Sequence, residues 1–153
     1  YACDSDAQAI VMLLDAYASD PAGGGEPLSA FARTHLVASL AARPQAYSVL
    51  AFDGVSPVGL VNCIEGFSTF KCKPLVNVHD VAVLARHRGR AIAQQMLAEA
   101  ERIARLRGAV KMTLEVLSGN EPAMRLYQRI GYEGYQLDPL LGTAQFMQKW
   151  LDA

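Results

Sequence analysis

The most constraining feature of the sequence is a strand–turn–helix–strand succession in its second half. The valine-rich run Val76–Leu84 predicts a buried strand, and the amphipathic run Arg90–Arg107 predicts a helix that Gly108 ends. The alternating run Val110–Leu117 predicts another strand. A helix between two strands of one sheet implies a crossover that leaves those strands parallel. We therefore expect a sheet with a parallel pair.

The other expected elements are shorter runs of the same two patterns. Asp53-Gly54 lies between two alternating runs and predicts a hairpin. The segment Gly66–Pro74 is polar and aromatic and predicts a connector. The remaining expected helices are Ala7–Ala18, Ser29–Arg43 and Asn120–Ile130, and the remaining expected strands are Ser48–Phe52, Val58–Glu65, Tyr132–Gln136 and Ala144–Trp150.

Length and composition suit one enzyme-sized domain. The chain has 153 residues, of which 52% are hydrophobic and 19% charged, so we expect a single domain over residues 1–153. The net charge of −1 offers no basic field for nucleic acid. No apolar run is long enough for a membrane span and no secretory leader is visible. Three widely spaced cysteines without a CxxC pair favour reduced thiols, a cytoplasmic location and no metal.

The turn Arg86–Ala91 has the features of an anion site. The first N–H groups of a helix lack internal partners, and the helix dipole is positive there, so a phosphate at that end satisfies both. Gly89 and Ala91 are small enough for close backbone approach, and three arginines add charge. Neither the triphosphate-binding nor the dinucleotide-binding glycine pattern is present. By itself the turn supports an anion site, or an ordinary turn with solvated arginines.

A second motif, later in the sequence, favours the ligand-binding interpretation of the turn. The turn Arg86–Ala91 fits the signature Arg/Gln-x-x-Gly-x-Gly/Ala, and Leu114–Tyr132 contains the elements Leu-Glu-Val, Asn, Ala, Leu-Tyr and Gly-Tyr in order. Together these two blocks resemble the GCN5-related N-acetyltransferase superfamily. With the two amino-terminal helices, the resemblance covers nearly the whole chain.

The resemblance implies a fold and a co-substrate. The fold is α/β (α+β), a mixed and mostly antiparallel sheet with helices on both faces. Two central parallel strands splay apart, and acetyl-CoA enters between them. No metal is implied. Homodimerisation is common in such folds, and only the resemblance suggests it.

The resemblance also assigns residues to the cofactor. Backbone groups at the end of the buried strand would bond the pantetheine arm, and the amides of the turn would hold the pyrophosphate. The common form of the turn has glycine where this chain has Ala91 and Ala93. The cofactor-binding positions are Val81, Ala82, Val83, Arg88, Gly89, Arg90, Ala91, Ile92, Ala93, Asn120, Ala123 and Tyr127.

Transfer to an amine requires groups that move protons. His79 is the candidate general base, because it aligns with a glutamate used as a base in polyamine acetyltransferases and because histidine side chains can serve as general bases. Glu65 and Asp80 are rival bases, and the alternative for His79 is a structural strand histidine, or one hydrogen-bonded to Asp80. Tyr127 is the candidate general acid toward the thioester sulfur, although it also belongs to an apolar helix face.

The implied reaction is acetyl transfer from acetyl-CoA to a primary amine, by direct attack in a ternary complex. We expect a small-molecule acceptor such as an amino acid or a polyamine, and neither a nucleic acid nor a membrane partner. A transferase for protein amino termini or lysines is one alternative. A non-catalytic acetyl-CoA-binding module is another.

Overall fold

The computed structural model describes residues 1–135, 138, 140, 142 and 144–151. Its contacts divide the chain into two compact units, Tyr1–Leu114 and Glu115–Ala153, and each is described by itself. No helix in the described part of the chain is long and apolar enough to cross a membrane.

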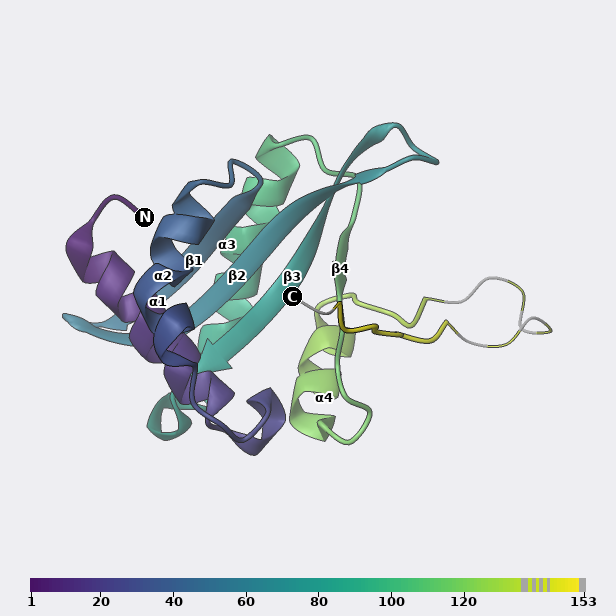
Figure 1. Ribbon diagram of the computed structural model, residues 1–153. Coiled ribbons are helices and arrows are strands. Elements are labelled where there is room, and N and C mark those ends of the chain that lie inside the picture. Colours follow the sequence, from purple (N-terminus) through teal and green to yellow (C-terminus); the bar gives the residue numbers. More distant parts are fainter. Residues whose placement is uncertain (136–137, 139, 141, 143, 152–153) are drawn as a thin grey trace. The chain divides into compact units, whose positions relative to one another are not determined.

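A four-stranded sheet forms the middle of the first unit (Figure 1). The strand order follows the chain, with three antiparallel strands and then β4 parallel to β3. The predicted mixed, mostly antiparallel sheet is confirmed, but β4 lies at the sheet edge among the described strands and not at the centre. The strands are β1 (Ala46–Asp53), β2 (Ser56–Ser68), β3 (Lys73–Val83) and β4 (Met112–Leu114).

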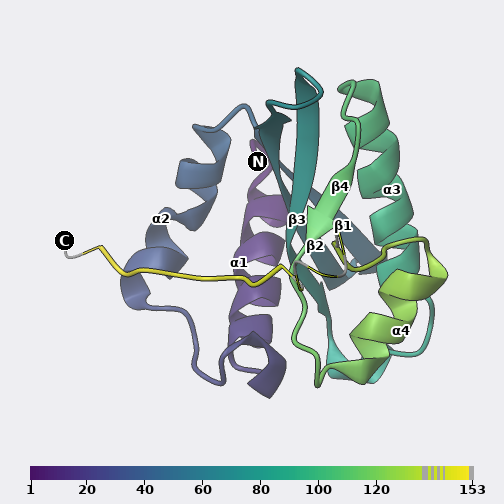
Figure 2. The same cartoon turned by 90° about the vertical axis from the view of Figure 1, so that its right-hand side faces the viewer.

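Helices cover both faces of this sheet, as predicted. Figure 2 shows α1 (Asp4–Ala18) and α2 (Ala30–Ala41) on one side and α3 (Ile92–Leu106) on the other. On the first side, Ile10 and Leu13 of α1 pack against Leu60 and Ala82 of the sheet, and all four are at most 5% exposed. On the other side, the Tyr47 hydroxyl donates a hydrogen bond to the Ala100 carbonyl of α3 at 2.9 Å.

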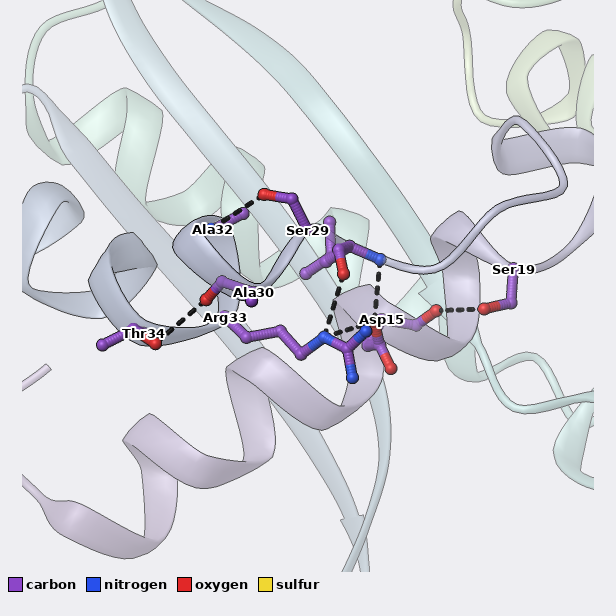
Figure 3. A network of polar contacts seen from close by, with 8 residues as sticks. Asp15, Ser19, Ser29, Ala30, Ala32, Arg33 and Thr34 are labelled. Carbon is purple, nitrogen blue, oxygen red and sulfur yellow. Dashed lines mark hydrogen bonds and ion pairs between the residues drawn. The ribbon is translucent and has the colours of Figure 1, made fainter.

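The connection between α1 and α2 is held by one carboxylate (Figure 3). Asp15 accepts a hydrogen bond from the Leu28 amide at 2.8 Å, and Arg33 lies 3.6 Å from the same oxygen. Arg33 also donates to the Leu28 carbonyl at 2.9 Å. Ser29 then caps α2 by accepting from the Ala32 amide. These contacts tie the carboxyl end of the glycine-rich loop to α1, and the loop includes the short 3₁₀ helix η1 (Pro21–Gly23).

Several predicted boundaries are wrong. The segment Gly66–Pro74 is not a connector, because β2 continues to Ser68 and β3 begins at Lys73 in a long hairpin (Figure 1). Strand pairing uses backbone groups, so it continues past the buried core, where Phe70 is 98% exposed. The strand predicted over Val110–Leu117 is reduced to β4, since three residues pair with β3.

The second unit contains α4 (Glu121–Arg129), with Asn120 as its N-cap and Pro122 in its first turn. The predicted closing strands Tyr132–Gln136 and Ala144–Trp150 are wrong for the described residues, none of which is in a strand, while Gln136 lies outside them. Alternation predicts which face a strand would bury. It does not supply the neighbouring strand edge that the pairing requires.

Candidate active site

A β-bulge interrupts β3 at His79. Asn62 of β2 pairs with Asp80, whereas the next residue, Cys63, pairs with Val78. His79 is therefore an extra residue with no counterpart on β2. Such insertions bend a strand and redirect its side chains, and they are frequent beside active sites.

The two parallel strands stop pairing at the same level. The last paired residues are Val78 of β3 and Leu114 of β4. From His79 onward β3 continues to Val83 along β2 without a β4 residue beside it. The bulge and the end of the parallel ladder therefore coincide, and the β4-side edge of β3 is open from this point.

The backbone of that open edge is suited to an extended ligand. The Leu84 amide donates to the Val58 carbonyl of β2 at 3.0 Å. Because successive residues of a strand alternate in direction, Val81 and Val83 direct their backbone groups away from β2. The Val83 carbonyl also accepts a hydrogen bond from Arg88 Nε at 3.1 Å. The side chain between them, that of Ala82, is buried in the core.

The amino terminus of α3 lacks the side-chain cap that α2 and α4 have, as does that of α1. Its N-cap is Ala91, in the left-handed conformation (φ 58°), with no side-chain cap and no acidic residue in the first turn. By contrast, Ser29 and Asn120 cap α2 and α4 through their side chains. This left-handed residue delays the helix, which starts at Ile92 and not at Arg90 as predicted. The uncapped turn fits a pyrophosphate, because the first amides of α3 lack a side-chain acceptor.

Two distant carboxylates hold the turn before α3. Arg88 Nη2 lies 2.8 Å from Asp20 Oδ2, and Arg90 Nη1 lies 2.9 Å from Asp53 Oδ2. Each arginine lowers the pKa of its carboxylate partner, chiefly through that hydrogen bond. Neither tether was predicted, since both aspartates are far from the turn in sequence and the Asp53-Gly54 pair indicates only a hairpin.

His79 is exposed and is held by its neighbour in the strand. Its Nδ1 lies 2.7 Å from Asn77 Oδ1, and Asn77 Nδ2 donates to Thr113 Oγ1 of β4 at 3.3 Å. An amide oxygen only accepts hydrogen bonds, so the hydrogen of neutral His79 is placed on Nδ1. Its Nε2 then carries the lone pair. The recorded partner of His79 is thus Asn77 and not Asp80.

Glu65 lies apart from His79. It pairs with Val76, on the face where Arg107, just past the end of α3, approaches its carboxylate to 3.5 Å. Asn77, the partner of His79, is the next residue after Val76 and therefore points to the opposite face. The described structure does not bring Glu65 and His79 together.

The residues of the second motif have local partners within the second unit. Asn120 Oδ1 accepts a hydrogen bond from the Ala123 amide at 3.3 Å and caps α4. Tyr127 makes an edge-to-face contact with Tyr132 at 5.9 Å between ring centroids. The roles of Asn120, Ala123 and Tyr127 toward a cofactor stay predictions. Among the described residues, no group of three or more His, Cys, Asp or Glu side chains is arranged to hold a metal ion.

Comparison with known proteins identifies relatives of both the sequence and the fold. The model of the acetyltransferase (GNAT) family matches residues 11–132. Streptothricin acetyltransferase of Streptomyces lavendulae is 38% identical over 71 residues, which are 45% of this chain. The chain spans only 38% of the length of that relative.

Solved structures share the fold over nearly the whole chain. A transcriptional regulator from Bacillus halodurans C-125 superposes with a TM-score of 0.79 and 17% identity, over 98% of this chain and 96% of that one. An aminoglycoside acetyltransferase from an uncultured soil metagenomic sample superposes with a TM-score of 0.78 and 12% identity, over 97% and 92% of the two chains.

Proposed function

The chain belongs to the acetyltransferase (GNAT) family, and we propose that it transfers the acetyl group of acetyl-CoA to a primary amine of a small molecule. The names of two relatives support the small-molecule acceptor: one is a streptothricin acetyltransferase and the other an aminoglycoside acetyltransferase. The observation that carries the proposal is the run Val78–Ile92. Within it, an open strand edge leads to an uncapped helix start.

Acetyl-CoA supplies an activated acetyl group as a thioester when bound. In this proposal, the outward backbone groups of Val81 and Val83 form hydrogen bonds with the amide groups of the pantetheine arm, which lies along β3 as an additional strand would. The turn from Arg88 to Ala93 accepts the pyrophosphate at the start of α3. Asp20 and Asp53 hold that turn in place and offset part of the arginine charge.

His79 is the proposed general base. An aliphatic amine has a pKa of about 10 and reacts only after it loses a proton. Asn77 keeps a hydrogen on Nδ1, so Nε2 of His79 is the acceptor for the amine proton. Tyr127 is the proposed acid that returns a proton to the departing sulfur. Glu65 is a weaker candidate for the base, because Arg107 already pairs with it.

A thiol-release assay over a panel of acceptors tests the function. The panel contains streptothricin, aminoglycosides, polyamines, free amino acids, and peptides with free amino termini or lysines. We expect acetyl-CoA-dependent thiol release with at least one small amine. Turnover of the peptides alone favours the protein-modifying alternative. Tight acetyl-CoA binding without turnover of any acceptor favours a non-catalytic module.

The base assignment has a separate test. His79→Ala is expected to lower kcat by about 10²-fold or more, as loss of a general base does. Its Kd for acetyl-CoA, measured by titration calorimetry, is expected to stay within about twofold of the parent, because the proposed cofactor contacts are backbone groups. A fall in kcat of less than about tenfold would remove His79 from the chemistry.

A further inference from the structure

A row of polar side chains crosses three strands at the level of the bulge. Ser48 of β1, Asn62 of β2 and Asp80 of β3 are direct cross-strand neighbours. Ser48 Oγ donates a hydrogen bond to Asn62 Oδ1 at 2.6 Å, and Asn62 Nδ2 donates to Asp80 Oδ2 at 2.9 Å. We call these three residues the polar row. It ends at the residue that follows His79.

The middle of this row is buried in an otherwise apolar part of the sheet. Asn62 is 4% exposed, and among the described residues no other polar or charged residue is buried. Leu60 and Val61, which lie beside it in β2, are fully buried. A buried amide is costly unless its groups are hydrogen-bonded. Here Ser48 satisfies the amide oxygen and Asp80 accepts from the amide nitrogen, so the orientation of Asn62 is determined. In turn, Asn62 fixes the Asp80 carboxylate.

Asp80 differs from three other half-buried carboxylates of the first unit, although Asp6 likewise has no ion pair among the described residues. Asp15, Asp20 and Glu65 each have an arginine within 4.0 Å. Within the described part of the chain, Asp80 has no such ion pair, and Asn62 is the donor recorded for its side chain. A carboxylate held in place without a counter-ion attracts a cation.

The charge of Asp80 acts on Tyr17 of α1. Burial raises the pKa of the Tyr17 hydroxyl, and the charges of Asp80 and Asp20 raise it further. The phenol of Tyr17 is therefore within electrostatic reach of both carboxylates. Because Arg88 pairs with Asp20, Asp80 is the carboxylate of the two that is left to attract an ammonium group.

We infer that Asp80 binds the ammonium form of the acceptor amine beside His79, with Asn62 and Ser48 as positioning residues that hold its carboxylate. This inference rests on the proposed function and specifies the acceptor class as an aliphatic amine, which is protonated at neutral pH. The bound ammonium gives one proton to Nε2 of His79, and the neutral amine then attacks the acetyl carbon. As the C–N bond forms, the C–S bond of the thioester breaks, the departing thiolate takes a proton from the proposed acid Tyr127, and the acetylated nitrogen releases its second proton to solvent, from which Tyr127 is reprotonated. Aromatic amines, which are neutral at this pH, gain nothing from Asp80.

The experiment compares two acceptor classes across four variants. Asp80→Asn keeps an oxygen for Asn62 and removes the charge. We expect KM for an aliphatic amine to rise by about tenfold or more, as for loss of a hydrogen-bonded ion contact. KM for an arylamine and Kd for acetyl-CoA are expected to stay within about twofold, because neither depends on the Asp80 charge.

The positioning role needs its own variants. Asn62→Val removes the donor to Asp80 and is expected to raise KM for the aliphatic amine, as Asp80→Asn does. Asn62→Thr keeps a hydroxyl donor and is expected to raise this KM by less. Cys63→Ala is the matched control, since Cys63 is the next buried residue of β2 and faces the other side. It is expected to lower the thermal midpoint without changing KM.

Three results overturn the inference. The first is a KM for the aliphatic amine that is unchanged in Asp80→Asn. The second is an equal rise in KM for the aliphatic amine and the arylamine in that variant. The third is an equal change in KM for the aliphatic amine in Asn62→Val and Cys63→Ala. If the parent protein acetylates no amine, the proposed function fails, and calorimetric titration with 1,4-diaminobutane then decides the inference separately. Binding that Asp80→Asn loses supports the ammonium site, whereas binding that is equal in both proteins, or absent from the parent, overturns it.

Discussion

Ala91 occupies a backbone conformation that side chains disfavour. The left-handed region costs a residue with a Cβ roughly 1–2 kcal/mol, and Ala91 has φ 58°. It retains this conformation at the point where the turn must present its amides outward. The residue therefore contributes strain at the proposed pyrophosphate site.

Replacing Ala91 by glycine is expected to relieve this strain. Ala91→Gly should raise the free energy of unfolding by up to about 1 kcal/mol, after the greater chain entropy of glycine is subtracted. Affinity for acetyl-CoA, measured by titration calorimetry, should be equal or better. The control is Ala93→Gly, which lies within α3 and should lower stability by about 1 kcal/mol. A large loss of affinity in Ala91→Gly would contradict the placement of the pyrophosphate.

Cys63 is buried beneath α3 and is protected from ionisation. Burial raises the pKa of its thiol to about 11, although Tyr47 and Arg107 act in the opposite direction. Between the ordinary thiol pKa of 9.0 and this value, the unfolded chain loses a proton that the folded chain keeps. The contribution of this thiol to stability is therefore complete below about pH 9 and is lost as pH rises toward 11.

This linkage predicts a pH-dependent difference between two proteins. From pH 8 to pH 10 the free energy of unfolding of the parent should fall by about 1 kcal/mol more than that of Cys63→Ala. Denaturant titrations at both pH values measure it, and other ionisations cancel in the comparison. Parallel pH dependence of the two proteins would show that Cys63 ionises normally in the folded state.

At the scale of elements, the bulge in β3 is the feature that opens the sheet. The residues on either side of His79 pair with adjacent residues of β2, so removal of His79 would leave a regular antiparallel ladder. The fold does not need the extra residue for pairing. The open strand edge begins at it, since β4 stops pairing immediately before it.

Deleting His79 should therefore separate stability from binding. We expect a folded protein whose thermal midpoint stays within a few degrees of the parent, with acetyl-CoA affinity reduced by about tenfold or more, equivalent to the loss of one or two backbone hydrogen bonds. His79→Ala keeps the bulge and serves as the control, with normal affinity and low kcat. If the deletion variant binds acetyl-CoA as tightly as His79→Ala does, the bulge has no part in the site.

At the scale of the whole molecule, the proposed roles fall on residues of both units. The first unit carries the open strand edge, the turn and His79, and the second carries Tyr127 on α4. An acid that acts only on the departing sulfur contributes to kcat and not to cofactor binding.

Tyr127→Phe keeps the ring and removes the hydroxyl. We expect kcat to fall by about 10²-fold with KM for acetyl-CoA nearly unchanged. Steady-state kinetics of thiol release measure both constants. Tyr132→Phe, the same change in the ring that contacts Tyr127, is the matched control and should keep kcat near the parent value. An unchanged kcat in Tyr127→Phe would exclude its hydroxyl from the chemistry.

The family, the order of elements and the turn before α3 were determined by the sequence alone. Each is a local property: periodicity within one helix or strand, a glycine and small residues at a helix start, or a motif within some twenty residues. The closing strands were predicted from the same kind of pattern and were wrong for the described residues, because alternation does not specify a pairing partner.

Tertiary structure decided which side chains meet. The bulge at His79, the partner of Glu65 and the row that ends at Asp80 depend on the register of β2 against β3. A one-residue shift in register moves every later side chain to the other face, and a period of two residues carries no information about such a shift. The family could therefore be inferred from local patterns, whereas the cross-strand neighbours of His79 and Asp80 were decided by the folded sheet.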